Sequence, residues 1–279
     1  MQNIYYEDTS FVKKNSDQYS LSIRFATDGL SFCIQDSSDK LLVLCFRPLN
    51  LVSREEIFAR ISRIPEEEEL LKLSYKKVFL LFSIREKILI PAAHFMKDHL
   101  AEFYRLCLPL ENGATLLYRE IRSMNAYLAE AMPGHLLQFL HRNYPDAFLS
   151  NSAYPFIRHA LSDVSMEEDR IFIDMQDRYF DLLIFKHNKV VLFNSFGYQS
   201  VTDFLYYLLN CLQNLKMAPD TVRATLSGKL TEDPRFLPAL EKYIPHLTLL
   251  ECPSLHRILK NKATNSAYFI HLLNIHKCE

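Results

Sequence analysis

The chain has 279 residues, of which 49% are hydrophobic and 23% are charged, and its formal net charge is −1. This length and apolar content suit one large domain or two joined domains with sizeable cores. A near-neutral balance without a basic stripe argues against nucleic acid or an acidic membrane surface as a partner.

The sequence carries no feature of export or membrane insertion. No apolar run approaches the roughly 20 residues of a transmembrane helix, and the start lacks the pattern of a signal peptide. Six widely spaced cysteines show neither Cys-x-x-Cys nor zinc-finger spacing, so we expect structural thiols among apolar neighbours. These features predict a cytoplasmic protein without a membrane span.

The first part of the chain predicts a hairpin, a third strand and a helix. The hairpin joins Tyr19–Phe25 to Leu30–Asp36 through an Asp-Gly turn, and Lys40–Phe46 returns as the third strand. A helix over Ser53–Ile64 begins with a capping box. The elements expected next are a short helix opened by Pro65 and residues 66–69, a buried strand at Lys76–Phe82, and a helix at Ala92–Leu106.

Residues 114–165 predict a mixed region before a second set of strands and helices. Its expected elements are strands at Thr115–Ile121 and Asn125–Ala131, a helix at Gly134–Asn143, and a helical end to Ala147–Leu161. The elements expected after it are strands within 171–186, a strand at Val190–Phe193, a helix at Val201–Leu215, a strand at Thr221–Leu226, a helix at Pro234–Tyr243, a strand at Leu247–Cys252 and a last apolar segment at Ala267–Ile275.

The chain nearly repeats its own pattern 150 residues apart. Residues 21–36 and 171–186 align without a gap and place apolar residues at the same alternate positions, as half-buried strands do. Each copy continues with a third strand and a helix. This internal duplication predicts two related half-domains that face each other across a cleft.

The order of these elements resembles the actin-like ATPase superfamily, which includes sugar kinases, heat-shock chaperones and actins. In that superfamily both hairpin turns are phosphate loops, and a later Gly-Gly stretch contacts the adenosine. The corresponding stretches here are Thr27-Asp28-Gly29, the run from Ile171 to Asp181, and Ser227-Gly228-Lys229, which is followed by Pro234 and Leu237. The resemblance covers residues 19–275.

The sequence also resembles a narrower group, bacterial proteins of unknown function with a degenerate actin-like fold. The likeness lies in Leu-Ser-Ile-Arg with Asp-Gly-Leu-Ser-Phe at residues 21–32, and in Leu-Phe-Asn-Ser-Phe with Asp-Phe-Leu-Tyr-Tyr-Leu-Leu at residues 192–209. It implies an α/β, duplicated actin-like (RNase H-like) fold with two mixed sheets and flanking helices. We expect a first half at 1–165 with an inserted subdomain at 114–165, and a second half at 166–279.

The first turn of this fold has lost part of the expected chemistry. Arg24 stands where the superfamily has an aspartate, and a guanidinium cannot help to bind a cation. Thr27, Asp28 and Gly29 still offer a hydroxyl, a carboxylate and a flexible peptide for a nucleotide. The simpler reading is that Asp-Gly is a common hairpin turn.

The second and third stretches are altered as well. Gln176-Asp177-Arg178-Tyr179 replaces a run of glycines. Asp174 either joins an arginine such as Arg24 or Arg178 in an ion pair, which we favour, or binds a metal. Gly228 keeps a position of close approach. Lys229 replaces a second glycine and either neutralises a phosphate or projects into solvent, the reading we prefer.

These changes favour a pseudo-ATPase, although the sequence does not decide whether the protein is an enzyme. We expect a non-catalytic binding or scaffold module that recruits an unknown protein partner and needs no cofactor. The alternative is an ATPase or ATP-dependent phosphotransferase with Mg²⁺ in the cleft, and a third possibility is a nucleotide sensor without turnover. The candidate nucleotide-binding residues are Thr27, Asp28, Gly29, Asp174, Gln176, Asp177, Gly228 and Lys229.

Overall fold

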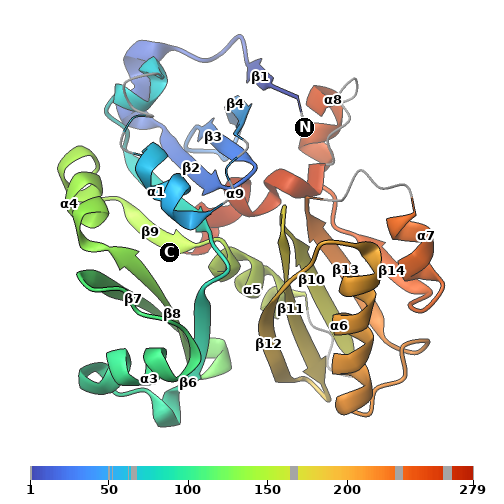
Figure 1. Cartoon of the computed structure of the whole chain (residues 1–279). Helices are drawn as coiled ribbons and strands as arrows, with labels where there is room; N and C mark the ends of the chain where they lie inside the picture. The colour runs from blue at the N-terminus through green and yellow to red at the C-terminus, as the bar shows by residue number, and fades with distance from the viewer. Residues whose placement is uncertain are drawn as a thin grey trace. The chain divides into compact units, whose positions relative to one another are not determined.

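The computed structural model describes residues 2–49, 51, 53–61, 63, 68–163, 169–229, 235–259 and 266–278, with the backbone alone at 54, 254, 256 and 257. The chain forms two compact units (Figure 1). Unit 1 contains Met1–Glu120, Ala126–Tyr154 and His271–Glu279, and unit 2 contains Ile121–Asn125 and Pro155–Ile270. The expected division into halves at 165/166 stays a prediction.

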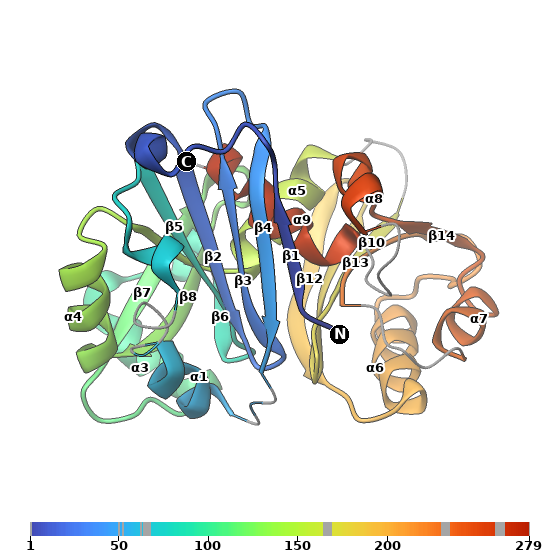
Figure 2. The ribbon, with the colours of Figure 1, turned by 90° about the horizontal axis from the view of Figure 1, so that it is seen from above.

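Unit 1 is built on a six-stranded mixed sheet (Figure 2). Its strands, in spatial order, are β1 (Ile4–Glu7), β4 (Leu41–Pro48), β3 (Gly29–Gln35), β2 (Ser20–Ala26), β5 (Lys77–Ser83) and β9 (Phe148–Asn151). The pairs from β1 to β2 are antiparallel, whereas β2, β5 and β9 run parallel. The carboxyl ends of these three parallel strands therefore lie at one edge of the sheet.

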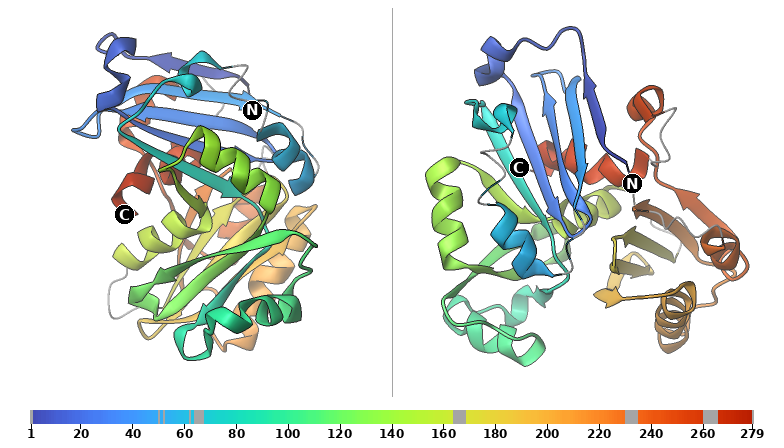
Figure 3. Two further views of the ribbon diagram at one scale, coloured as in Figure 1. Left: turned by 90° about the vertical axis from the view of Figure 1, so that its left-hand side faces the viewer. Right: turned by 45° about the horizontal axis from the view of Figure 1, so that its top comes forward.

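A smaller three-stranded sheet completes unit 1. Its order is β6 (Lys87–Pro91), β8 (Ala126–Pro133) and β7 (Ala114–Ile121). Helix α4 (Gly134–Asn143) continues directly from β8 and lies beside this sheet (Figures 1 and 3). The other helices that begin in unit 1 are α1 (Arg54–Ile61), α3 (Leu100–Cys107) and α5 (Ala153–Ser162), and α5 continues into unit 2.

The strand alternation places one face of the larger sheet in the core of unit 1. Leu21, Ile23 and Phe25 of β2 are buried in that core together with residues of α1 and α4. The opposite face carries polar side chains, among them Arg24 and Ser31, which are also buried. These charged and polar groups are buried in the folded chain, where each needs a partner.

The end of the chain returns to unit 1. It runs through a 3-10 helix at Ser266–Phe269, α9 (Ile270–Asn274) and a 3-10 helix at Ile275–Cys278. The carbonyl of Leu272 accepts a weak bond from Cys33 Sγ at 3.9 Å, and the carbonyl of Cys278 accepts one from Tyr154 Oη at 3.3 Å. Residues 271–278 are thus part of the first unit.

Unit 2 contains a five-stranded mixed sheet and its helices. The strands, in spatial order, are β12 (Lys189–Gly197), β11 (Tyr179–Lys186), β10 (Arg170–Met175), β13 (Arg223–Gly228) and β14 (His246–Leu249). The helices that follow are α6 (Val201–Asn214), α7 (Phe236–Glu241) and α8 (Pro253–Leu259). Helix α6 begins with a complete capping box in which Ser200 and Asp203 exchange side-chain and backbone bonds.

The two sheets share one strand order. In unit 1 the order β4-β3-β2-β5-β9 matches β12-β11-β10-β13-β14 of unit 2, and β1 is added at the edge of the first sheet. The registers agree as well, because Arg24 faces Ser31 across one hairpin and Asp174 faces Asp181 across the other, each 150 residues further along. The strands and helices predicted for the two repeated segments are confirmed.

Three local expectations differ from the structure. The predicted helix at Ala92–Leu106 is broken, because Phe95 and Met96 are extended and Phe95 stacks on Tyr127 at 3.8 Å between ring centroids. The strand β6 before it was missed. Cys107 was expected among apolar neighbours and is exposed, while Pro65 and residues 66–67 lie outside the described residues.

The predicted Asp-Gly hairpin turn is also wrong in its geometry. Such a turn needs positive φ at both of its central residues, and neither Asp28 nor Gly29 has one. The two residues between β2 and β3 are Thr27 and Asp28, because Gly29 already belongs to β3. A Cβ atom on Gly29 would lie 2.4 Å from the carbonyl oxygen of Arg47, so the close approach of β4 explains this glycine.

Within the described part of the chain, no helix is long and apolar enough to cross a membrane.

Candidate functional site

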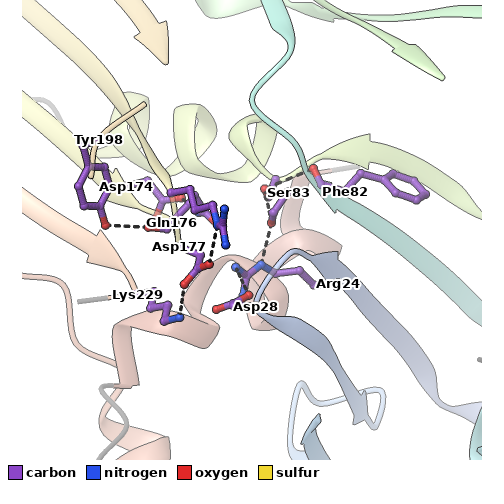
Figure 4. Close-up of polar contacts among 11 residues, drawn as sticks. Arg24, Asp28, Phe82, Ser83, Asp174, Gln176, Asp177, Tyr198 and Lys229 are labelled. Atoms are coloured by element: carbon purple, nitrogen blue, oxygen red, sulfur yellow. Dashed lines mark hydrogen bonds and ion pairs between the residues drawn. The ribbon is translucent and has the colours of Figure 1, made fainter. Parts of the chain in front are cut away.

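The turn between β10 and β11 in unit 2 holds an acidic side chain between two cations. Asp177 Oδ1 lies 2.5 Å from Lys229 Nζ, and its Oδ2 lies 3.7 Å from Arg178 Nε (Figure 4). The Lys229 side chain is only 19% exposed, so the expectation that it projects into solvent is wrong. The lysine follows the end of β13, where β13 runs beside β10, and this position brings it to the turn.

Asp174 lies near the end of β10 and is completely buried. Its Oδ1 accepts a hydrogen bond from Ser227 Oγ at 2.7 Å, and its Oδ2 accepts one from Gln176 Nε2 at 2.5 Å. A buried carboxylate needs such donors, because an unpartnered charge in the interior is very costly. Gln176 is held in turn, since its carbonyl accepts a bond from Tyr198 Oη at 3.0 Å (Figure 4).

The aspartate belongs to a polar row that crosses four strands. Ser227 of β13, Asp174 of β10, Asp181 of β11 and Ser195 of β12 are register partners in that order. Asp181 is also fully buried, and its Oδ1 accepts a bond from Ser195 Oγ at 2.6 Å. Sequence reasoning found the two acids, but it missed both serines, because which strands pair is set by the fold.

Gly228 is required by the packing of β13 against β10. Its φ is +82°, and a Cβ atom there would lie 2.2 Å from the carbonyl oxygen of Met175 and 2.8 Å from Asp174 Oδ1. The same carbonyl accepts the backbone N–H of Lys229 at 2.7 Å. The close approach expected of this glycine is therefore made to the protein's own backbone. Residues 230–234 of the same motif lie outside the described residues.

In unit 1 the corresponding position is filled by a buried arginine. Arg24 is 4% exposed, and its Nε donates a hydrogen bond to Ser83 Oγ at 2.8 Å. Ser83 Oγ lies 2.8 Å from Ser152 Oγ, which joins the ends of β5 and β9 to the arginine (Figure 4). Arg24 Nη2 lies 4.0 Å from Asp28 Oδ1. Sequence reasoning had no signal for the two serines.

The backbone of the same turn is bound to the segment that follows β4. The carbonyl of Thr27 accepts the N–H of Leu51 at 3.0 Å, and the carbonyl of Asp28 accepts the N–H of Leu49 at 2.9 Å. Asp28 is 8% exposed, and Thr27 is half-buried. The structure therefore brings Thr27, Asp28 and Gly29 together in unit 1, and Asp174, Gln176, Asp177, Gly228 and Lys229 together in unit 2.

The contacts in both turns are made within the protein. In the described ranges, no group of three or more His, Cys, Asp or Glu side chains is arranged to hold a metal ion. The acids of unit 2 are held by Lys229, Arg178, Gln176 and Ser227, and Arg24 stands opposite Asp28 in unit 1. Asp174 and Asp177 therefore each have hydrogen-bond or ion-pair partners in the folded chain.

Comparison with solved structures defines the class of fold. A protein from Bacteroides thetaiotaomicron VPI-5482, described as having an actin-like ATPase fold and unknown function, superposes with a TM-score of 0.76 at 21% identity. The match covers 90% of this chain and 99% of that one. A PilM–PilN type IV pilus biogenesis complex matches with a TM-score of 0.55 at 11% identity, over 93% of this chain and 98% of that one. The protein has an actin-like ATPase fold.

The sequence then gives the family. Residues 8–247 match the model of the family described as "Protein of unknown function (DUF3822)", and the chain belongs to this family. Among curated proteins, none matches the sequence significantly. Both the fold and the family predicted from the sequence are thereby confirmed.

Proposed function

We propose that this protein is a non-catalytic actin-like module that acts as a scaffold for a protein partner. The observation that carries the proposal is the neutralised turn of unit 2, where Lys229 and Arg178 lie beside Asp177. A cation at 2.5 Å from a partly buried carboxylate occupies the place that a metal would need. A carboxylate that is paired with cations in this way is not available to a metal, and the catalysis of phosphoryl transfer depends on positioning and on charge stabilisation by a metal.

The arginine of unit 1 supports the same proposal. Arg24 is buried, and its Nε donates a hydrogen bond to Ser83. A guanidinium remains protonated at every physiological pH. In the superfamily arrangement suggested by the sequence, this position would bear an aspartate, and the substitution inverts the charge. The substitution changes the charge but not the strand pairing, because Arg24 faces Ser31 just as Asp174 faces Asp181 in the second hairpin.

The role as a scaffold is supported by one structural neighbour. The PilM chain is solved as part of a type IV pilus biogenesis complex with PilN, so that protein engages another protein. The likeness is one of fold, and it supplies an analogy for the class of partner only. The proposed partner is a protein, with neither nucleotide nor metal required for its binding.

The alternative is an ATPase or phosphotransferase that uses ATP and Mg²⁺. For Asp177 to bind a metal, Lys229 would have to leave it, and Asp174 would have to exchange the bonds from Gln176 and Ser227 for metal-bound water. Each exchange loses a charge-assisted bond, worth about 1.5–3 kcal/mol when formed to a charged group. The proposal therefore predicts weak or absent binding of ATP.

Calorimetric titration with ATP and Mg²⁺, together with an assay of phosphate release, tests the proposal. We expect no heat of binding, no thermal shift at millimolar nucleotide and no phosphate release. Lys229→Met provides a matched comparison, because it removes the cation that lies 2.5 Å from Asp177 Oδ1 without changing the acid. Micromolar binding by the wild-type protein that Asp174→Asn abolishes would overturn the scaffold proposal. Binding without phosphate release would instead identify a nucleotide sensor.

The scaffold itself is tested by chemical cross-linking in cells that express the protein at its natural level. A stoichiometric partner identified there is then purified and titrated with the protein in the absence of nucleotide. We expect binding that added ATP and Mg²⁺ leave unchanged. A complex that forms only with ATP would contradict a nucleotide-independent scaffold.

A further inference from the structure

Unit 1 contains a pocket that is separate from the turns described above. It has a volume of about 420 Å³ and lies between the small sheet, α4 and β9. Pockets of roughly 300–1,000 Å³ are the usual size for small-molecule ligands. Leu117 and Leu128 of the small sheet and Leu137 of α4 supply apolar wall, and Arg119 of β7 and Glu130 of β8 supply charge.

Arg119 is fixed in position but keeps most of its hydrogen-bonding capacity. Its Nη2 donates to the carbonyl of Leu149 at 3.0 Å, and its guanidinium lies 3.8 Å above the centroid of the Phe148 ring. The stacked ring and the bond set the plane of the guanidinium. A guanidinium has five N–H donors, and among the described residues Leu149 is the hydrogen-bond acceptor seen for it. The remaining donors suit a carboxylate, which arginine binds bidentately.

Glu130 is the second charged group of the pocket and is 4% exposed. Its Oε2 accepts a bond from Asn151 Nδ2 at 2.9 Å, while the same amide also donates to the carbonyl of Ile84 at 3.2 Å. In the described part of the chain no hydrogen bond is made to the other carboxyl oxygen, Oε1. Burial raises the pKa of Glu130 to about 7, against the lowering effects of Asn151, Lys87 and Arg119.

The two charged groups line one pocket without forming a direct ion pair. Among the described residues no ion pair within 4.0 Å joins Arg119 to Glu130, although both line the same cavity. Lys87 faces Glu130 across the β6–β8 ladder, but its ammonium group donates to the carbonyl of Ile84 at 3.1 Å. A ligand with one positive and one negative end can therefore satisfy both groups at once.

We propose that this pocket binds a small zwitterion with an apolar side chain, an apolar α-amino acid. The carboxylate of the ligand pairs with Arg119, its ammonium group pairs with Glu130, and its side chain packs against Leu117, Leu128 and Leu137. This inference is independent of the proposed scaffold role, because it uses none of the residues of the two turns. It would give the protein a means of responding to a metabolite.

The pocket also predicts how binding depends on pH. Glu130 must be ionised to receive an ammonium group, so affinity rises as pH increases through about 7. The groups that face or adjoin Glu130 are Lys87 from β6, Arg119 from β7, Asn151 from β9, His141 from α4 and Asp146 before β9.

Calorimetry with leucine and two matched analogues on the wild-type protein tests the proposal. Isoamylamine keeps the ammonium group and the apolar chain but lacks the carboxylate, and 4-methylpentanoate lacks the ammonium group. Each missing ion pair should weaken binding by about tenfold or more, since a bond to a charged group contributes roughly 1.5–3 kcal/mol. The proposal of a zwitterionic ligand would be overturned if either analogue bound as tightly as leucine. It would also be overturned if no apolar amino acid bound at millimolar concentration.

Two substitutions that each remove a charge locate the site, and a third is the control. Glu130→Gln and Arg119→Gln should each weaken leucine binding by about tenfold or more. Glu120→Gln changes the next residue of β7, which is exposed and does not line the pocket, and should leave the affinity within a factor of about two. If all three variants bind leucine with the wild-type affinity, the ligand binds elsewhere and the inference is refuted. If a variant fails to fold, the titrations of the wild-type protein with leucine and its two analogues still test the proposal.

Discussion

Gly228 allows a direct test of whether the packing of β13 against β10 requires a glycine. In Gly228→Ala the new Cβ would lie 2.2 Å from the carbonyl oxygen of Met175 and 2.8 Å from its nitrogen, both of which are backbone atoms. A backbone contact cannot be relieved by a side-chain rotation, so the strands must move apart. The positive φ costs about 1–2 kcal/mol for a residue with a Cβ, and overpacking adds about 1–3 kcal/mol. We expect a total loss of roughly 2–5 kcal/mol.

Gly113 is the matched control for this substitution. Its φ of +77° is almost the same as that of Gly228, but a Cβ atom there would have no heavy atom within 4 Å. Gly113→Ala should therefore cost only the conformational term, about 1–2 kcal/mol. The difference between the two variants isolates the crowding at the end of β13 from the strain of the backbone.

Differential scanning calorimetry is suited to the comparison, because the chain has no Trp to report unfolding by fluorescence. It also resolves the two units if they unfold separately, and the two glycines lie in different units. At roughly 2–4 °C per kcal/mol for a chain of this size class, Gly228→Ala should lower the melting temperature from its wild-type value by several degrees more than Gly113→Ala does. Equal decreases would refute the argument that packing explains Gly228.

Three further outcomes follow from the structure. Asp203→Ala removes the acceptor for the backbone N–H of Ser200 in the capping box of α6, and should lower stability in urea by about 1 kcal/mol. The pKa of Glu130 is raised in the folded protein to about 7, so the free energy of unfolding should fall as the pH rises from about 4.5 to 7. Glu130→Gln should remove this dependence on pH, and an unchanged dependence in the variant would contradict the assignment to Glu130. Ellman's reagent should label the exposed Cys107 first and leave the buried Cys33 unreacted, because burial raises the pKa of its thiol to about 12; rapid labelling of the Cys107→Ser variant would contradict this order.

Local pattern was sufficient to predict most of the two sheets. Alternating apolar residues in 21–36 and 171–186 identified both hairpins, and the constant offset of 150 residues predicted that Arg24 and Asp174 occupy corresponding positions, as the strand registers confirm. These signals succeed because one apolar face imposes a period of two on a strand. The prediction of a helix at Ala92–Leu106 was wrong because local pattern does not report contacts between distant parts of the chain, such as the stacking of Phe95 on Tyr127.

The candidate site was predictable in part only. Sequence identified the acids and the glycine, but not the partners that give them their present environment. Ser227 reaches Asp174 because β13 runs beside β10, and Lys229 reaches Asp177 for the same reason. Their separations of 53 and 52 residues place these contacts beyond any local motif. The prediction that Lys229 projects into solvent was therefore wrong, because the sequence alone does not show that β13 pairs with β10.

The return of residues 271–278 to unit 1 sets an order of assembly during synthesis. Unit 1 gains the contacts of Leu272 and Cys278 only after the whole of Pro155–Ile270 has been translated. Domains tend to fold as units while the ribosome adds residues, and here the later unit can be finished before the earlier one. The segment Met1–Tyr154 gains these contacts last, so a chain truncated after residue 270 would contain every segment of unit 2 but would lack the last segment of unit 1, His271–Glu279.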